Sequence, residues 1–93
     1  MKFYDKTRLP APENVLRFVG AEQVSVRGLY LSARCPFPDH TDRSPSFSMH
    51  GLSGAWRCFG CHRHGGDSLA LYMALTGLPF NVAVRELGAW GVA

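Results

Sequence analysis

The three cysteines of this chain all fall within one pattern of metal-binding spacing. Cys35 and His40 are separated by four residues, Cys58 and Cys61 by two, and seventeen residues lie between the two pairs. Two short-spaced pairs of thiol and imidazole ligands are what a closed tetrahedral zinc site needs. Buried, unpaired cysteines are the alternative, but a Cys-x2-Cys motif with a separate Cys/His pair is specific for metal. The pattern therefore predicts one structural Zn²⁺ ion held by Cys35, His40, Cys58 and Cys61.

The choice of His40 as the histidine ligand rests on its place in the chain. It follows Cys35 across a short loop that two prolines stiffen. His50 lies within an expected hairpin, where its side chain should point outward. His62 and His64 follow Cys61 too closely to complete the same site. Four protein ligands leave no open position for a catalytic water, so the predicted ion is structural.

Composition indicates a single small globular domain. The 93 residues are 46% hydrophobic and 18% charged, which argues against disorder. The formal charge of +3 is a mild bias toward polyanionic partners. An odd number of cysteines argues against a disulfide framework, and the first twelve residues contain no apolar stretch typical of a signal peptide. We therefore expect a cytoplasmic protein without a membrane partner.

Periodicity predicts an α+β fold with a small antiparallel sheet and short helices. Alternation of apolar and polar residues predicts β structure over 24–34, 46–50 and 55–58, with turns near Gly28 and over 51–54. Phe47, Met49 and Trp56 should face the core.

Helices are indicated by apolar spacing together with end signals. They are expected over 12–19, over 69–75 after a cap at Asp67 or Ser68, and over 79–87. Their predicted buried residues include Leu69, Leu71, Tyr72, Phe80, Val84 and Leu87. The polar, proline-containing residues 1–12 should form a loose arm.

Four short segments together resemble the zinc-binding domain of bacterial and phage-type replicative DNA primases. They are Cys35-Pro36-Phe37, Pro45-Ser46-Phe47, Cys58-Phe59-Gly60-Cys61 and Gly65-Gly66-Asp67. The resemblance covers about residues 29–77, with residues 1–28 as an arm and short helix and residues 78–93 as a helix packing on the same domain. The Cys-x4-His spacing departs from the family's Cys-x2-His, and phage or mobile-element members are the closer comparison.

The resemblance implies a zinc ribbon that binds single-stranded template DNA, helps to choose the start site and presents the template to a polymerase domain. The chain has seven scattered Asp and Glu residues and no carboxylate cluster for catalytic Mg²⁺. We therefore expect no enzymatic activity from this chain alone. Its expected partners are a primase polymerase domain on another chain or region, or a replicative helicase. The alternative function is a zinc ribbon that docks on replication or transcription machinery without contacting DNA.

Independent support for nucleic-acid binding comes from arginines interleaved with aromatic residues between Arg27 and His64. A basic sheet face with stacking rings is the general recipe for binding single strands. Tyr30, Ser32 and Arg34 should share one face of a strand, and Arg57 should face away from Trp56. The predicted contact residues are Tyr30, Arg34, Arg57, Phe59, His62 and Arg63. The alternative is that these arginines are solvent-exposed surface residues that do not contact nucleic acid.

Overall fold

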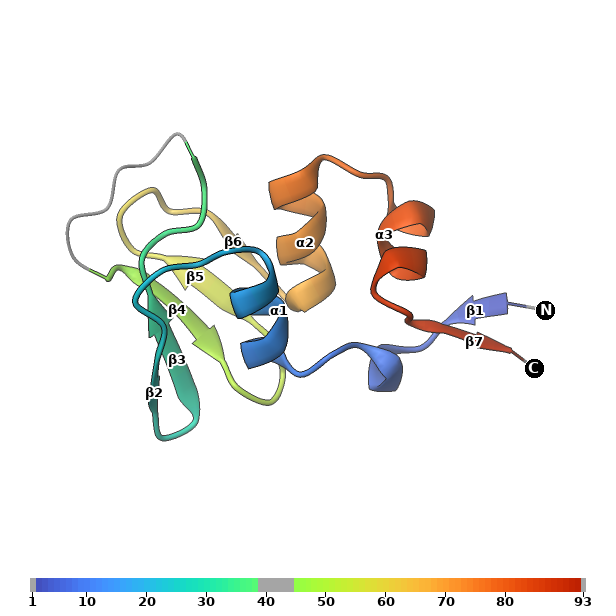
Figure 1. Cartoon of the computed structure of the whole chain (residues 1–93), viewed down its shortest axis with the longest axis horizontal. Helices are drawn as coiled ribbons and strands as arrows, with labels where there is room; N and C mark the ends of the chain where they lie inside the picture. The colour runs from blue at the N-terminus through green and yellow to red at the C-terminus, as the bar shows by residue number, and fades with distance from the viewer. Residues whose placement is uncertain (1, 39–44, 93) are drawn as a thin grey trace.

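A computed structural model describes residues 2–38 and 45–92 and shows an α+β fold with two sheets (Figure 1). The larger sheet has five antiparallel strands in sequential order. They are β2 (Ser25–Arg27), β3 (Tyr30–Ala33), β4 (Phe47–His50), β5 (Trp56–Cys58) and β6 (His64–Gly65). The predicted small zinc ribbon with an antiparallel sheet and flanking helices is confirmed.

Three helices lie to one side of this sheet, the first two next to it and the third beyond the second (Figure 1). They are α1 (Pro12–Phe18), α2 (Ser68–Thr76) and α3 (Phe80–Glu86). Asp67 caps α2, because its Oδ1 accepts a 2.8 Å hydrogen bond from the Ala70 N–H. Gly77 ends α2 with a left-handed φ of 72°, which glycine adopts without steric cost. The predicted helices and the end signals of α2 are therefore confirmed.

Register explains which strand residues are buried. Leu31 pairs with Met49, and Met49 with Trp56. Because side chains alternate across a strand, these three point to the same face of the sheet. They pack with residues of α1 and α2 into the main core, whose buried members are Leu16, Leu31, Ala33, Phe37, Phe47, Met49, Trp56, Cys58 and Leu71. The predicted burial of Phe47, Met49 and Trp56 is confirmed.

The expectation of a loose N-terminal arm is wrong. Residues 2–4 form strand β1 (Lys2–Tyr4), which pairs antiparallel with a C-terminal strand, β7 (Trp90–Val92). A 3-10 turn η1 (Lys6–Arg8) follows, and Asp5 caps it by accepting a hydrogen bond from the Thr7 N–H. The β1–β7 pair brings the two ends of the chain together beside α3 (Figure 1).

The predicted burial of Phe80 is also wrong, since 44% of this residue is exposed. Its ring meets the rings of Tyr4 and Trp90 edge-on, with centroids 5.3 Å and 6.3 Å away. Phe80 therefore lies at the rim of a second, smaller core, whose buried members are Leu69, Tyr72, Ala83, Val84, Leu87 and Ala89. No helix in the described part of the chain has the length and apolar character needed to cross a membrane.

Candidate functional site

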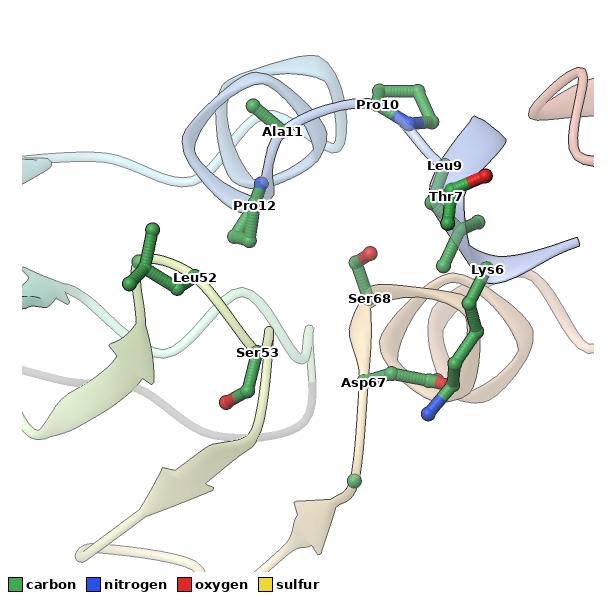
Figure 2. Close-up of a pocket in the computed structure, with 12 residues that line it drawn as sticks. Lys6, Thr7, Leu9, Pro10, Ala11, Pro12, Leu52, Ser53, Asp67 and Ser68 are labelled. Carbon is green, nitrogen blue, oxygen red and sulfur yellow. The ribbon is translucent and has the colours of Figure 1, made fainter.

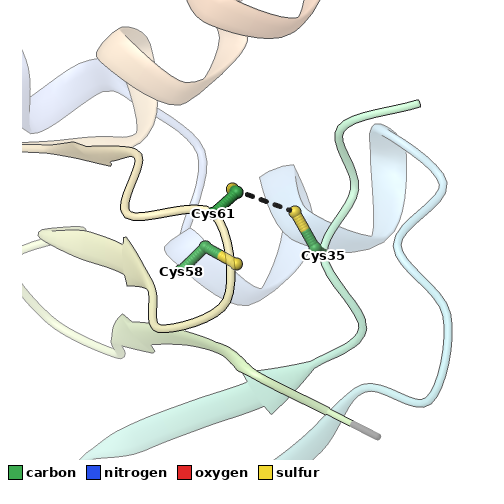
Figure 3. Close-up of side chains that lie close together, drawn as sticks. All are labelled: Cys35, Cys58 and Cys61. Atoms are coloured by element: carbon green, nitrogen blue, oxygen red, sulfur yellow. Dashed lines mark hydrogen bonds between the residues drawn. The ribbon is translucent and has the colours of Figure 1, made fainter. Parts of the chain in front are cut away.

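Three thiols converge where strands β3 and β5 end (Figure 3). The Sγ atoms of Cys35, Cys58 and Cys61 all lie within 4.8 Å of one another, and those of Cys35 and Cys61 are 3.8 Å apart. Zinc binds thiolate sulfur at about 2.3 Å, so two sulfurs on a tetrahedral zinc ion lie roughly 3.8 Å apart. The spacing and chemistry of these donors therefore fit one zinc ion.

Local backbone bonds hold the Cys58–Cys61 turn in shape. Cys58 donates its N–H to the Arg63 carbonyl (2.8 Å), and His62 donates its N–H to the Cys58 carbonyl (2.9 Å). Phe59 donates its N–H to the carbonyl of Ser46, which ties the turn to the segment before β4. His62 closes the turn with a left-handed φ of 65°. These bonds aim the Cys58 and Cys61 sulfurs toward Cys35, which lies two residues beyond β3.

The predicted fourth ligand, His40, lies outside the described residues. Of the histidines that the structure does describe, none joins the group formed by the three sulfurs. His50 instead belongs to the β4–β5 turn, where its Nδ1 accepts hydrogen bonds from the N–H groups of Leu52 and Ser53. The assignment of His40 therefore remains a prediction.

The protein environment shifts the pKa values of Cys35 and Cys58 in opposite directions. Burial raises the pKa of Cys35 to about 12, and the sulfurs of Cys58 and Cys61 add to this effect. Burial also acts to raise the pKa of Cys58, but hydrogen bonds from Ser46 and from backbone N–H groups of Cys61 and Gly60 outweigh it and lower that pKa to about 6. The protein thus stabilises the Cys58 thiolate by itself. The positive charge of a bound divalent cation would stabilise the thiolate of Cys35 as well.

The exposed face of the sheet carries part of the predicted nucleic-acid surface. Tyr30 is 54% exposed at the start of β3, and Arg57 is exposed on β5 opposite the buried Trp56. The Arg57 guanidinium lies 5.2 Å from the ring centre of Phe59, which is 61% exposed. Arg57 and Phe59 therefore form a stacked pair beside the three converging thiols.

The other predicted contact residues are placed differently. Arg34 follows β3, where its Nη1 lies 3.7 Å from a carboxylate oxygen of Glu22. The guanidinium of Arg63 lies 4.5 Å from the ring centre of Phe37, so it bridges the two loops that carry the cysteines. His62 is exposed in the turn. Arg34 and Arg63 thus have structural contacts as well as any role in binding.

Register adds three residues that the sequence analysis missed. Ser32 pairs with Ser48, Ser48 with Arg57, and Arg57 with His64, so these side chains form one row across the exposed face. At the other end of the face, the rings of Tyr30 and His50 meet edge-on with centroids 5.2 Å apart. Alternation had indicated which way each strand faces, but only the strand pairing brings Ser48, His50 and His64 onto this surface.

Comparison with known proteins agrees with this geometry. Residues 14–90 match the family model described as the CHC2 zinc finger. Curated relatives include the DNA primase of Geobacillus stearothermophilus, 32% identical over 89 residues that cover 84% of this chain and 14% of the relative. The DNA primase of Escherichia coli strain K12 is 36% identical over 63 residues, which cover 68% of this chain and 10% of the relative.

The DNA primase of Streptomyces coelicolor is 40% identical over 57 residues, which cover 61% of this chain and 8% of the relative. The chain thus spans only a small part of the length of these relatives. Its family match covers most of its own length and includes all three cysteines that converge in the structure. This chain belongs to the CHC2 zinc finger family.

Proposed function

We propose that this chain is the DNA-binding component of a DNA primase, a zinc ribbon that binds single-stranded template DNA. Family membership and the primase relatives supply the biological context. The observation that carries the proposal is the exposed sheet face, which has a ring pair at one end and an arginine stacked on an aromatic ring at the other. The whole enzyme's polymerase centre would lie on another chain or region.

The proposed metal site holds one structural Zn²⁺ ion between Cys35, Cys58, Cys61 and His40. When bound, the ion would neutralise the closely spaced thiolates and fix the two loops relative to each other. The Arg63–Phe37 contact, at 4.5 Å, joins the same two loops from outside the ligand set. The metal therefore acts on DNA binding indirectly, by holding Phe59 and its turn next to Arg57.

The chemistry of the sheet face suits an unpaired nucleic-acid strand. Exposed rings such as Tyr30 and Phe59 can stack on bases of any sequence, and Arg57 can make bidentate contacts with phosphate. Ser32 and Ser48 lie on the same face of the sheet, between the Tyr30 end and the Arg57 end. Their small side chains would let a nucleic-acid strand approach closely. Strands β2–β6 contain no Asp or Glu, so nothing on them repels phosphate. The proposed contact set is Tyr30, Arg34, Arg57, Phe59, His62 and Arg63, with His50 and His64 added.

A titration of the zinc-loaded protein with short fluorescein-labelled oligonucleotides, followed by fluorescence anisotropy, tests this proposal. We expect binding to single strands that weakens as salt rises. Arg57→Ala should weaken binding and lower the salt slope by about 0.7, as expected for one lost phosphate contact. Phe59→Ala should weaken binding by about 1–3 kcal/mol with little change in the slope.

The matched control is Arg17→Ala, which removes an exposed arginine of α1 that pairs with Glu13 rather than facing the sheet surface. It should leave binding and salt slope nearly unchanged. Equal effects of Arg17→Ala and Arg57→Ala would show that only net charge matters. The absence of binding to any single strand would contradict the proposal.

A further inference from the structure

Ser46 contacts the Cys58–Cys61 turn at two points. Its Oγ lies 3.5 Å from the Sγ of Cys58, which is hydrogen-bonding distance for sulfur. Its main-chain carbonyl accepts a 2.9 Å hydrogen bond from the N–H of Phe59, the residue after Cys58. Ser46 directly precedes β4, whose first residue, Phe47, pairs with Cys58 in register. Strand pairing and the carbonyl bond therefore hold the Ser46 hydroxyl beside the sulfur.

The bond between these two side chains has one possible direction once a metal is bound. Zinc binds cysteine as the thiolate, which has no proton and can only accept a hydrogen bond. The hydroxyl of Ser46 must then donate to the Cys58 sulfur. A hydrogen bond to a charged acceptor is roughly twice as strong as one between neutral groups, so this contact is strongest in the metal-bound state.

The predicted zinc site needs such donors, because three thiolates and one Zn²⁺ ion together carry a net charge of −1. Cys58 is 0% exposed, so water cannot disperse the charge on its sulfur. Main-chain N–H groups of Gly60 and Cys61 also donate to this sulfur. Those two donors survive a substitution at position 46, whereas the Ser46 hydroxyl does not.

We infer that Ser46 is a positioning residue for the zinc site, whose hydroxyl orients the Cys58 thiolate and helps the chain to retain the metal. The inference rests on the zinc site of the proposed function and adds a residue that is not itself a ligand. Hydrogen-bond partners of metal ligands fix the orientation of those ligands and tune the affinity for the metal. This role also accounts for a serine immediately before β4, which the spacing of the cysteines does not explain.

Zinc affinity of Ser46→Ala, measured by competition with a coloured chelator, tests this role. The variant loses only the hydroxyl, because the carbonyl that bonds to Phe59 belongs to the main chain. We expect the Kd for zinc to rise about 10- to 100-fold, the usual effect of removing a hydrogen-bond partner of a metal ligand. Ser46→Thr, which keeps a hydroxyl, should restore the native affinity, whereas the similarly shaped Ser46→Val should not.

Replacement of zinc by Co²⁺ supplies a second readout, one that a change in folding stability would not move. With cobalt in excess, the charge-transfer absorption from thiolate to metal should shift to longer wavelength in Ser46→Ala and Ser46→Val. The shift is expected because a sulfur that loses a donated hydrogen bond holds its electrons less tightly. Ser46→Thr should give the native spectrum.

Two other serines of the β4–β5 hairpin provide matched controls. Ser48 lies on the exposed face of the sheet, paired with Arg57. Ser53 lies in the turn at the far end of the hairpin, where its Oγ accepts a hydrogen bond from the Ala55 N–H and it lines a hollow of about 560 Å³ (Figure 2). Ser48→Ala and Ser53→Ala should keep the native zinc affinity and cobalt spectrum. Unaltered far-UV circular dichroism of the zinc-saturated proteins establishes that all variants fold.

The inference is overturned if Ser46→Ala binds zinc as tightly as the native chain does. It is also overturned if Ser46→Thr performs no better than Ser46→Val, or if either control weakens zinc binding as much as Ser46→Ala. A native chain that binds neither zinc nor cobalt would overturn the zinc site and the role of Ser46 together. These measurements involve no DNA, so their outcome is independent of whether the chain binds single strands.

Discussion

The indole Nε1–H of Trp56 donates a 3.0 Å hydrogen bond to the main-chain carbonyl of Asp67. Trp56 lies on β5, two residues before the metal-site residue Cys58, and Asp67 caps helix α2. The same Asp67 side chain contacts Lys6 and Tyr4 from the N-terminal segment. Through these two residues, the strand that carries the predicted metal ligand Cys58 is joined to helix α2 and to the first strand of the chain.

The first prediction concerns the close contact between Trp56 and Gly65. A Cβ atom added at Gly65 would lie 2.6 Å from the Cε2 and Nε1 atoms of the indole, so the ring or strand β6 must move. Gly65→Ala should therefore lower the free energy of unfolding by about 1–3 kcal/mol, the usual cost of overpacking. Urea denaturation of the zinc-loaded protein measures this.

The neighbouring Gly66 provides the control for this substitution. A Cβ atom at Gly66 meets nothing within 4 Å, and its φ is not left-handed. Gly66→Ala should leave the free energy of unfolding nearly unchanged. Equal stability of the Gly65→Ala and Gly66→Ala proteins would mean that the indole does not pack against β6 as described.

The second prediction concerns Tyr4 at alkaline pH. Burial, followed by the charge of Asp67 and a hydrogen bond to it, raises the pKa of Tyr4 from 10.0 to about 12. Because the folded state favours the protonated phenol, this stabilisation is complete below pH 10 and is lost as pH rises toward 12. The free energy of unfolding should therefore fall more steeply over this range in the native protein than in Tyr4→Phe. Identical pH profiles for the two proteins would place Tyr4 away from Asp67.

The third prediction identifies the fourth zinc ligand. Single alanine substitutions of His40, His50, His62 and His64 should be compared for zinc affinity by competition with a coloured chelator. Only His40→Ala should weaken zinc binding strongly, because the three other histidines do not join the sulfur group in the described structure. Loss of zinc from His62→Ala or His64→Ala, with His40→Ala normal, would assign the ligand to the turn after Cys61.

Local sequence signals predicted much of this fold. The predictions that failed concern contacts between residues that are far apart in the sequence. Pro12, Gly77 and Gly88 mark helix ends by backbone preference, and alternation marks which strand residues are buried. The β1–β7 pair joins the two ends of the chain, and its three-residue strands carry too little alternation to be detected.

The candidate site shows the same division between local and distant information. The Cys-x2-Cys turn and the Cys35 loop were predicted from spacing, and the structure brings their three sulfurs together. The row that links Ser32, Ser48, Arg57 and His64 depends on strand register, which residues on each separate strand do not specify. The contacts of Arg34 with Glu22 and of Arg63 with Phe37 likewise needed the folded chain.

Metal content measured together with folding, before and after chelation, tests the central claim most directly. Elemental analysis of the purified protein should give one zinc ion per chain, and EDTA should remove it with loss of the far-UV circular dichroism of the folded state. Added zinc should restore both, because the binding free energy of a structural zinc site contributes to folding. A protein that contains no zinc, or one that keeps its full circular dichroism after zinc is removed, would contradict the account.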